Sequence, residues 1–242
     1  MSSVSSARTR SAARPPRPVL VTVVLAVVVA VGSLVTAALL RPDAARPARG
    51  GLSMPTSTAN SGCGDDPCRV VASASVNGMP VELLADADGG TGRLRAGGPS
   101  SGSVAEVTIT AMGVRLNRDS LRCPPSDTPV CLVRGPHDGG MAGEVHVWRG
   151  DSWRSDQRPY FSDAGSVVLD DATGDEVPEV VVVRHECAGT DSAAACQQAP
   201  VLGEVFDLGG RQVGCTETYG SPGSLRDWPE VDVESYELTE CP

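Results

Sequence analysis

Residues 166–183 read SVVLDDATGDEVPEVVVV, in which two valine-rich segments flank an acidic turn that contains Gly174 and ends at Pro178. Valine favours extended strands because its branched Cβ packs well on a pleated sheet. Glycine, proline and aspartate are typical of the turns that bound such strands. This stretch therefore predicts a β-hairpin.

A similar arrangement recurs along the chain at a fixed interval. Three prolines, Pro80, Pro129 and Pro178, are each separated by 49 residues and each is followed by a short apolar run. Each run leads through a glycine-rich connection to a second strand-like segment. These segments begin at Gly92, Gly143 and Gly203. A fainter fourth copy begins at Pro229.

The spacing of these segments indicates a repeated β unit. Strands that recur with a period near 50 are typical of propeller blades. No stretch after Leu40 keeps the apolar periodicity of a helix for three turns. We therefore predict an all-β domain built as a partial or small β-propeller-like repeat with a period of about 49, with a β-sandwich as the alternative.

The eight cysteines indicate an oxidising compartment. They are Cys63, Cys68, Cys123, Cys131, Cys187, Cys196, Cys215 and Cys241. Their number is even, and a cysteine-zinc site would need C-x-x-C pairs, whereas the shortest spacing is C-x4-C. Eight cysteines allow 105 pairings, and among these we expect disulfides between sequential neighbours, because each neighbouring pair brackets a plausible loop. The expected pairs are Cys63–Cys68, Cys123–Cys131, Cys187–Cys196 and Cys215–Cys241.

The N-terminal quarter differs from the rest of the chain. Residues 19–40 are 22 residues without a charge, which as a helix is long enough to cross a hydrocarbon core of about 30 Å. We predict a cytoplasmic disordered tail at 1–18, a transmembrane signal-anchor helix at 19–40, a flexible stalk at 41–62 and an extracytoplasmic β domain at 63–242. A cleaved signal with its cleavage site at residues 35–37 is the alternative, although the apolar core here is longer than the roughly 7–15 residues usual for such signals.

The charge distribution excludes one class of partner. After residue 50 the chain carries 13 arginines against 29 acidic residues, a net charge of −16. Such a domain repels the phosphates of nucleic acids. The chain has no lysine and a single isoleucine, which resembles the composition of high-GC bacteria such as actinobacteria.

The acidic turn carries the one motif that indicates chemistry. Residues 170–182, DDATGDEVPEVVV, resemble the repeat of FG-GAP (integrin-α-like) β-propellers, whose hairpin loops hold calcium. The resemblance implies calcium ligands at Asp171, Thr173, Asp175, the backbone carbonyl of Val177, and Glu179. Calcium prefers six to eight hard oxygens, and oxygens at alternate loop positions can turn inward together. Thr173 replaces an acidic or amide side chain of the pattern, and Glu176 replaces a glycine. The alternative is an acidic hairpin turn without metal.

No catalytic motif is present elsewhere. The sequence has no G-x-S-x-G nucleophile elbow. For the three histidines, His137, His146 and His185, we expect neither a catalytic nor a metal-binding role. His146 alternates with Glu144 and Trp148 and should share one strand face with them. The tripeptide at 149–151, Arg-Gly-Asp, should be a hairpin turn between two strands.

Together these features predict a membrane-anchored extracytoplasmic binding module of the cell envelope rather than an enzyme. Its partner would be an envelope protein or a glycan, and calcium would stabilise the module. One alternative is a structural envelope protein without a ligand site. The other is an extracytoplasmic hydrolase that uses paired carboxylates such as Asp171 and Glu179.

Overall fold

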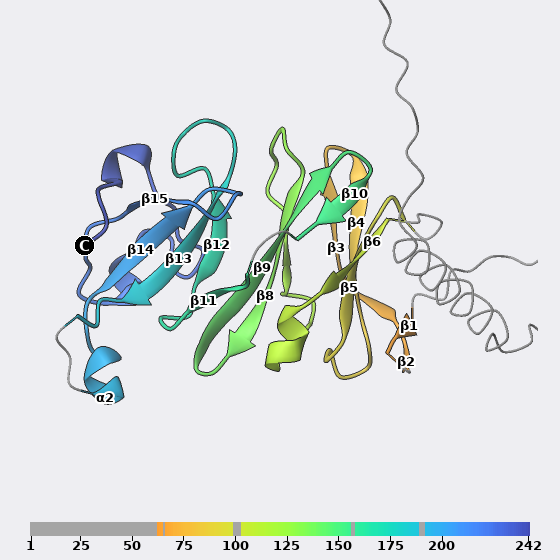
Figure 1. The fold of residues 1–242 in the computed structure, drawn as a ribbon, viewed down its shortest axis with the longest axis horizontal. Coiled ribbons are helices and arrows are strands. Elements are labelled where there is room, and N and C mark those ends of the chain that lie inside the picture. Colours follow the sequence, from red (N-terminus) through yellow and green to blue (C-terminus); the bar gives the residue numbers. More distant parts are fainter. Residues whose placement is uncertain (1–61, 65, 99–102, 156–157, 189–191) are drawn as a thin grey trace, which may run out of the picture. The chain divides into compact units, whose positions relative to one another are not determined.

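The computed structural model describes most of the chain after residue 61 (Figure 1). The described ranges are 62–64, 66–98, 103–155, 158–188 and 192–242. The predicted tail (1–18), transmembrane helix (19–40) and nearly all of the predicted stalk (41–62) lie outside them. Within the described ranges, no helix has both the length and the apolar character needed to cross a bilayer.

The described residues form an all-β fold, as predicted. They contain three larger antiparallel sheets and one two-stranded hairpin of β1 (Gly62–Cys63) and β2 (Asp66–Pro67). Helix is confined to single turns, namely α2 (Ala193–Cys196), η1 (Ile109–Met112), η2 (Pro222–Ser224) and η3 (Ser235–Glu237).

Each larger sheet is a meander in which strands that follow one another in the chain also pair (Figure 1). The first sheet contains β3 (Arg69–Val76), β4 (Met79–Ala85), β5 (Gly92–Ala96) and β6 (Val104–Val107). The second sheet contains β7 (Leu121–Arg122), β8 (Val130–His137), β9 (Gly140–Arg149) and β10 (Ser152–Arg154), with β11 (Tyr160–Ser162) also paired to β9. The third sheet contains β12 (Val167–Asp170), β13 (Glu179–His185), β14 (Val201–Phe206) and β15 (Gln212–Cys215).

The spacing of 49 residues matches the spacing of the sheets. Pro80 is the second residue of β4, and Pro129 and Pro178 immediately precede β8 and β13. Each proline therefore lies at the start of the second strand of a sheet, where its missing N–H costs little of the hydrogen-bonded ladder. The fainter fourth copy is wrong, because residues 229–233 form no strand.

The sheets pack face to face. One cluster of buried side chains lies between the first and second sheets and includes Leu83, Leu94 and Val133. A second cluster lies between the second and third sheets and includes Leu132 and Val180. Successive side chains of a strand point to opposite faces, so β8 supplies residues to both clusters. This two-sided burial explains why the strands are runs of valine rather than alternating patterns.

Gly143 of β9 allows the second and third sheets to approach closely. A Cβ atom at this position would lie 2.9 Å from Cδ1 of Leu132 and 3.0 Å from Cγ1 of Val167 on the neighbouring sheet. Gly143, which marks the second copy of the repeat in the sequence, is therefore needed for the second and third sheets to pack together.

The C-terminal segment, residues 225–238, covers the outer face of the third sheet. Leu225, Val231 and Val233 are buried against Val181 and Val183 of β13. The backbone N–H of Val233 donates to Asp170 Oδ2 at 2.8 Å, and Ser166 Oγ donates to the carbonyl of Pro229 at 2.7 Å. The valines of the supposed fourth copy thus serve as a cap on the third sheet.

The outer face of the first sheet is instead charged. Arg95 pairs with Glu82 at 2.7 Å, and Arg93 pairs with Glu106 at 3.6 Å. These side chains alternate along their strands with residues of the core, so they lie on the opposite face. With one end charged and the other covered, the described sheets form an open series without closure into a ring.

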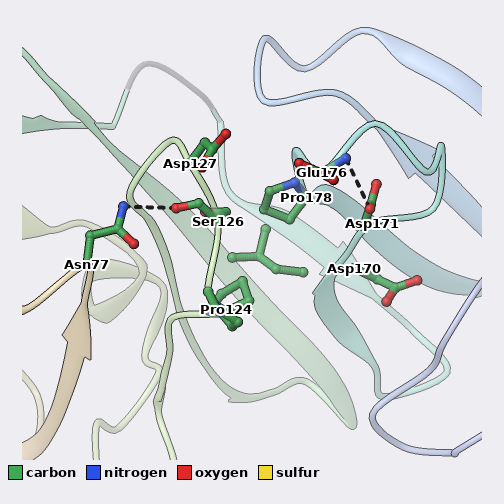
Figure 2. A pocket seen from close by; sticks show the side chains of 10 residues that line it. Asn77, Pro124, Ser126, Asp127, Asp170, Asp171, Glu176 and Pro178 are labelled. Atoms are coloured by element: carbon green, nitrogen blue, oxygen red, sulfur yellow. Dashed lines mark hydrogen bonds between the residues drawn. The ribbon is translucent and has the colours of Figure 1, made fainter.

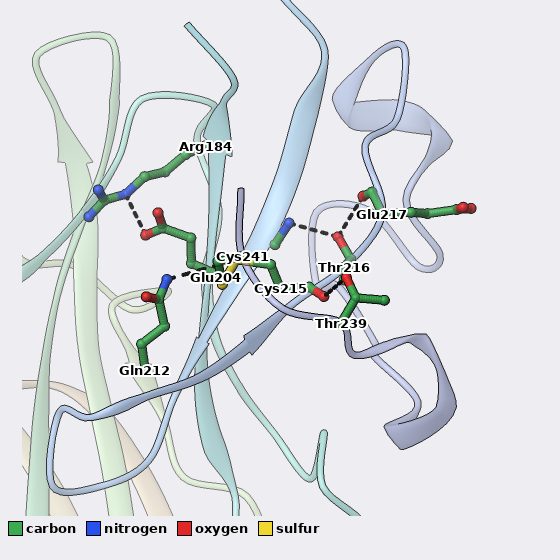
Figure 3. Close-up of a disulfide and its surroundings, with 9 residues drawn as sticks. Arg184, Glu204, Gln212, Cys215, Thr216, Glu217, Thr239 and Cys241 are labelled. Atoms are coloured by element: carbon green, nitrogen blue, oxygen red, sulfur yellow. Dashed lines mark hydrogen bonds and ion pairs between the residues drawn. A yellow bond between two sulfur atoms is a disulfide. The ribbon is translucent and has the colours of Figure 1, made fainter. Parts of the chain in front are cut away.

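All four expected disulfides are formed between sequential cysteines. Cys215–Cys241 joins the last strand to the end of the C-terminal segment, as Figure 3 shows. Beside it, the backbone groups of Cys215 and Thr239 exchange two hydrogen bonds of 2.9 and 2.8 Å.

Candidate functional site

A groove of about 510 Å³ lies where three loops meet, one from each sheet (Figure 2). We call it the three-loop groove. Its residues come from the β3–β4 turn, the β7–β8 loop, the end of β12 and the β12–β13 loop. They are Asn77, Pro124, Pro125, Ser126, Asp127, Leu169, Asp170, Asp171, Glu176 and Pro178. The loops are equivalent in the repeat, since each connects the first and second strands of its sheet.

The first and second loops are joined directly. Asn77 Nδ2 donates to the carbonyl of Ser126 at 3.0 Å, across 49 positions of sequence (Figure 2). Asn77 and Gly78 both have positive φ, 49° and 77°, as the tight turn of a two-residue hairpin requires. The Cys123–Cys131 disulfide closes the loop that carries Ser126, so this wall of the groove is constrained covalently.

The third loop is organised by Asp171. Its Oδ1 accepts from the backbone N–H groups of Gly174 and Asp175 at 2.9 and 3.0 Å, and its Oδ2 accepts from that of Glu176 at 3.1 Å. Glu176 has φ of +67°, in the left-handed region that glycine usually occupies. The three hydrogen bonds to Asp171 hold this turn in place and leave the Glu176 side chain exposed at the groove.

Glu179 faces the interior of the same loop. It is 4% exposed, and its two oxygens accept from the backbone N–H of Thr173 at 3.1 Å and from Thr173 Oγ1 at 3.2 Å. Burial raises the pKa of Glu179, and the hydrogen bonds from Thr173 lower it in part. Burial also raises the pKa of Asp170, which accepts from the N–H of Val233.

The predicted calcium ligands all lie on this loop, and their oxygens have the hard character that calcium requires. In the structure, however, the carboxylates of Asp171 and Glu179 accept from N–H and O–H groups of the loop, as does Asp175 Oδ1 from the N–H of Val177 at 2.9 Å. Among the described residues, ligand atoms of the loop acids do not form a group within 4.8 Å of one another. Calcium binding therefore stays a prediction.

One group of potential ligands does occur in the described ranges, at Asp163, Cys187 and Cys196. These two cysteines are joined in a disulfide. Because a metal binds the thiolate and not the disulfide, this group is not a metal site in the oxidised protein.

The groove carries one sign of charge. Four of its lining residues are acidic, namely Asp127, Asp170, Asp171 and Glu176, and none of the lining residues is basic. Its apolar surface comes from Leu169 and three prolines. The arrangement can accept a cationic group against the carboxylates and an aliphatic portion against the prolines.

The paired-carboxylate hydrolase gains no support from this geometry. Asp171 lines the groove, whereas Glu179 is buried and is not among the lining residues.

The histidines do not line the groove. His137 and His185 each lie near one aspartate, at 3.3 Å from Asp138 and 3.4 Å from Asp163. The tripeptide at 149–151 is the hairpin turn between β9 and β10, as expected.

Neither the β7–β8 loop nor Asn77 was predicted to be part of a site. The available signal was the repeat itself. Residues that occupy equivalent positions before Pro80, Pro129 and Pro178 lie at the same end of three successive sheets, and such loops can share a groove.

Known proteins provide no further guide to the site. No protein-family model, no curated protein and no solved structure matches the chain.

Proposed function

We propose that the chain is a membrane-anchored extracytoplasmic binding module of the cell envelope, and that the three-loop groove binds a positively charged segment of its partner. One observation carries this proposal. A loop from each sheet contributes to one groove, whose lining includes four acidic residues together with Leu169 and three prolines. Grooves that combine apolar surface with a few polar groups are the usual form of binding sites.

Charge favours a cationic partner. Carboxylates that line one groove concentrate the negative electrostatic potential there and attract basic groups from solution. The excess of 29 acids over 13 arginines after residue 50 acts in the same direction over longer distances. An arginine-bearing extended peptide fits, because its guanidinium can pair with carboxylates while its methylene groups pack on proline.

Two features support the location. Residues 19–40 are uncharged and long enough to span a bilayer. Four disulfides with no free cysteine among the described residues suit an oxidising compartment. If the cysteines of the protein in intact cells react with a thiol-alkylating reagent, the proposed location is wrong.

The fold proposal is a propeller-like series of FG-GAP type with calcium in the β12–β13 loop. It is supported by the three successive antiparallel meanders of four or five strands, by their spacing, and by the positive φ of Glu176 at the glycine position of the pattern. The charged outer face of the first sheet supports a partial series rather than a ring.

A binding experiment tests the groove. The full chain in neutral detergent is titrated with a hexa-arginine peptide at about 50 mM salt, and Asp127→Asn/Glu176→Gln is compared with a control of equal charge change, Asp88→Asn/Glu106→Gln. All four side chains are exposed, and only the first two line the groove. Each exposed charge pair contributes up to about 1 kcal/mol, so the groove variant should bind about tenfold more weakly.

The control should change the dissociation constant by less than about twofold, since distant surface charges are screened. An equal loss in both variants would mean that the peptide senses net charge alone, which would contradict a site in the groove. No binding by the wild-type chain would favour the structural alternative.

A further inference from the structure

Two buried polar residues lie between the first and second sheets. Glu144 and His146 alternate on β9, and their side chains are 1% and 0% exposed. They point toward the first sheet, because Val145 and Val147, which alternate with them, belong to the cluster on the other face. This pair plays no part in the three-loop groove.

Glu144 holds the first sheet to the second. Its Oε2 accepts from the backbone N–H of Thr108 at 2.6 Å, from Thr108 Oγ1 at 2.9 Å and from the N–H of Ile109 at 3.2 Å. Thr108 directly follows β6, the last strand of the first sheet. One carboxylate oxygen of the second sheet thus receives three hydrogen bonds from the end of the first.

His146 is the other half of the contact. Its Nε2 lies 3.4 Å from Glu144 Oε1, and neither ring nitrogen has a hydrogen bond to any described residue. Among the described residues, Glu144 is the one charged group that shifts the pKa of His146. The first sheet supplies apolar side chains to this cluster, β8 supplies Cys131 opposite His146, and β10 supplies Trp153.

We propose that Glu144 and His146 form an acid-sensitive latch, so that protonation of His146 opens the contact between the first and second sheets. A charged imidazolium in an apolar cluster is unfavourable unless it is fully paired. Glu144 can pair with it only through Oε1, because Oε2 already binds Thr108 and Ile109. The Nδ1–H of the imidazolium would still have no acceptor among the described residues, so the charged ring is stabilised only where the contact opens and water reaches it.

The direction of the effect follows from burial. Burial lowers the pKa of His146, and the charge of Glu144 raises it in part. An unfolded histidine has a pKa near 6.5. The open state therefore binds a proton more readily than the closed state. The contact between the sheets keeps its full stability above about pH 6.5 and loses stability as the pH falls below that value.

Hydrogen exchange on the full chain measures the latch directly. Between about pH 7.5 and 5.5, after correction for intrinsic exchange rates, protection of β9 and of residues 108–112 should fall by up to about tenfold, since one proton linkage changes an equilibrium tenfold per pH unit. Protection of β13 and β14 in the third sheet should stay within about twofold. Equal loss in both regions would overturn the proposal.

Two further measurements assign the effect to His146. His146→Gln, which cannot titrate in this range, should remove the pH dependence, whereas the control His137→Gln should keep it. If His146→Gln does not fold, the imidazole resonance of His146 in the wild-type chain decides. While the protein is folded, this resonance should titrate below the pKa of an unfolded histidine. Titration of this resonance at or above about pH 6.5 in the folded protein would overturn the proposal.

Discussion

Removing the Cys215–Cys241 disulfide should destabilise the protein more than removing Cys63–Cys68. The two pairs are well matched, because each joins one buried cysteine to one that is partly exposed. They differ in the sequence separation of their cysteines, 26 positions against 5. In the chain-entropy model these separations correspond to about 3.5 and about 2 kcal/mol of stability near 25 °C.

The longer loop also matters for packing. It contains the segment that covers the third sheet, including Val231 and Val233, which are each 2% exposed. Without the covalent link, the cap remains attached through the backbone pair of Cys215 and Thr239 and through the hydrogen bond from Val233 to Asp170. We therefore expect the variant to fold with a looser C-terminal segment.

Thermal unfolding of the full chain in neutral detergent provides the assay. For a domain of this size, 1 kcal/mol shifts the midpoint by about 2–4 °C. Cys215→Ala/Cys241→Ala should lower the Tm by about 7–14 °C, and Cys63→Ala/Cys68→Ala by about 4–8 °C. A loss for the shorter loop that equals or exceeds the loss for the longer one would refute the reasoning from loop length and from the cap.

Three other outcomes are expected. Leu132→Ala should cost about 2–5 kcal/mol in denaturant unfolding because Leu132 is fully buried between two sheets, whereas Val70→Ala, at a side chain that is 46% exposed, should cost less than about 0.5 kcal/mol; similar costs would contradict the layered core. Asn77→Ala should weaken hexa-arginine binding several-fold, since it removes the 3.0 Å bond to Ser126; unchanged binding would show that the two loops need no link. If the β12–β13 loop binds calcium, about 5 mM Ca²⁺ should raise the Tm relative to EDTA, and Asp175→Asn should abolish the rise; identical midpoints with and without calcium would exclude a stabilising site.

Local sequence patterns were sufficient to predict the second and third strands of each sheet. Proline and glycine at fixed offsets from valine runs marked the second and third strands of each sheet, because these residues restrict or release the backbone at their own positions. The disulfide pairing was predictable for a similar reason. Each bond joins neighbours in the sequence, so each loop closure is short and depends little on the rest of the fold.

The fourth copy shows where local patterns fail. Val231 and Val233 alternate as strand residues do, and both are buried. They pack on the third sheet as irregular backbone and do not pair with another strand. An alternating pattern indicates that one side of a segment is buried, but it does not say whether a neighbouring strand offers its hydrogen bonds.

Glu144 and His146 show a second limit. Alternation placed them on one face of a strand, and the structure agrees. The alternation of residues could not show that the first sheet covers this face. Nor could it show that Glu144 accepts a hydrogen bond from Thr108, 36 positions away in the sequence. Polar residues in a strand usually mark an exposed face, and only the packing of a second sheet reverses that expectation.

The amino-acid sequence alone was enough to establish the β class, the repeat of 49 residues and the uncharged stretch at 19–40, whereas for the cysteines it gave a preferred pairing that the structure then fixed. Each of these depends on the chemistry of residues close to one another in the chain. The three-loop groove, the cap on the third sheet and the buried contact of Glu144 with Thr108 were decided by tertiary structure. They join residues from different sheets, and such contacts depend on how the sheet faces pack, which no local pattern encodes.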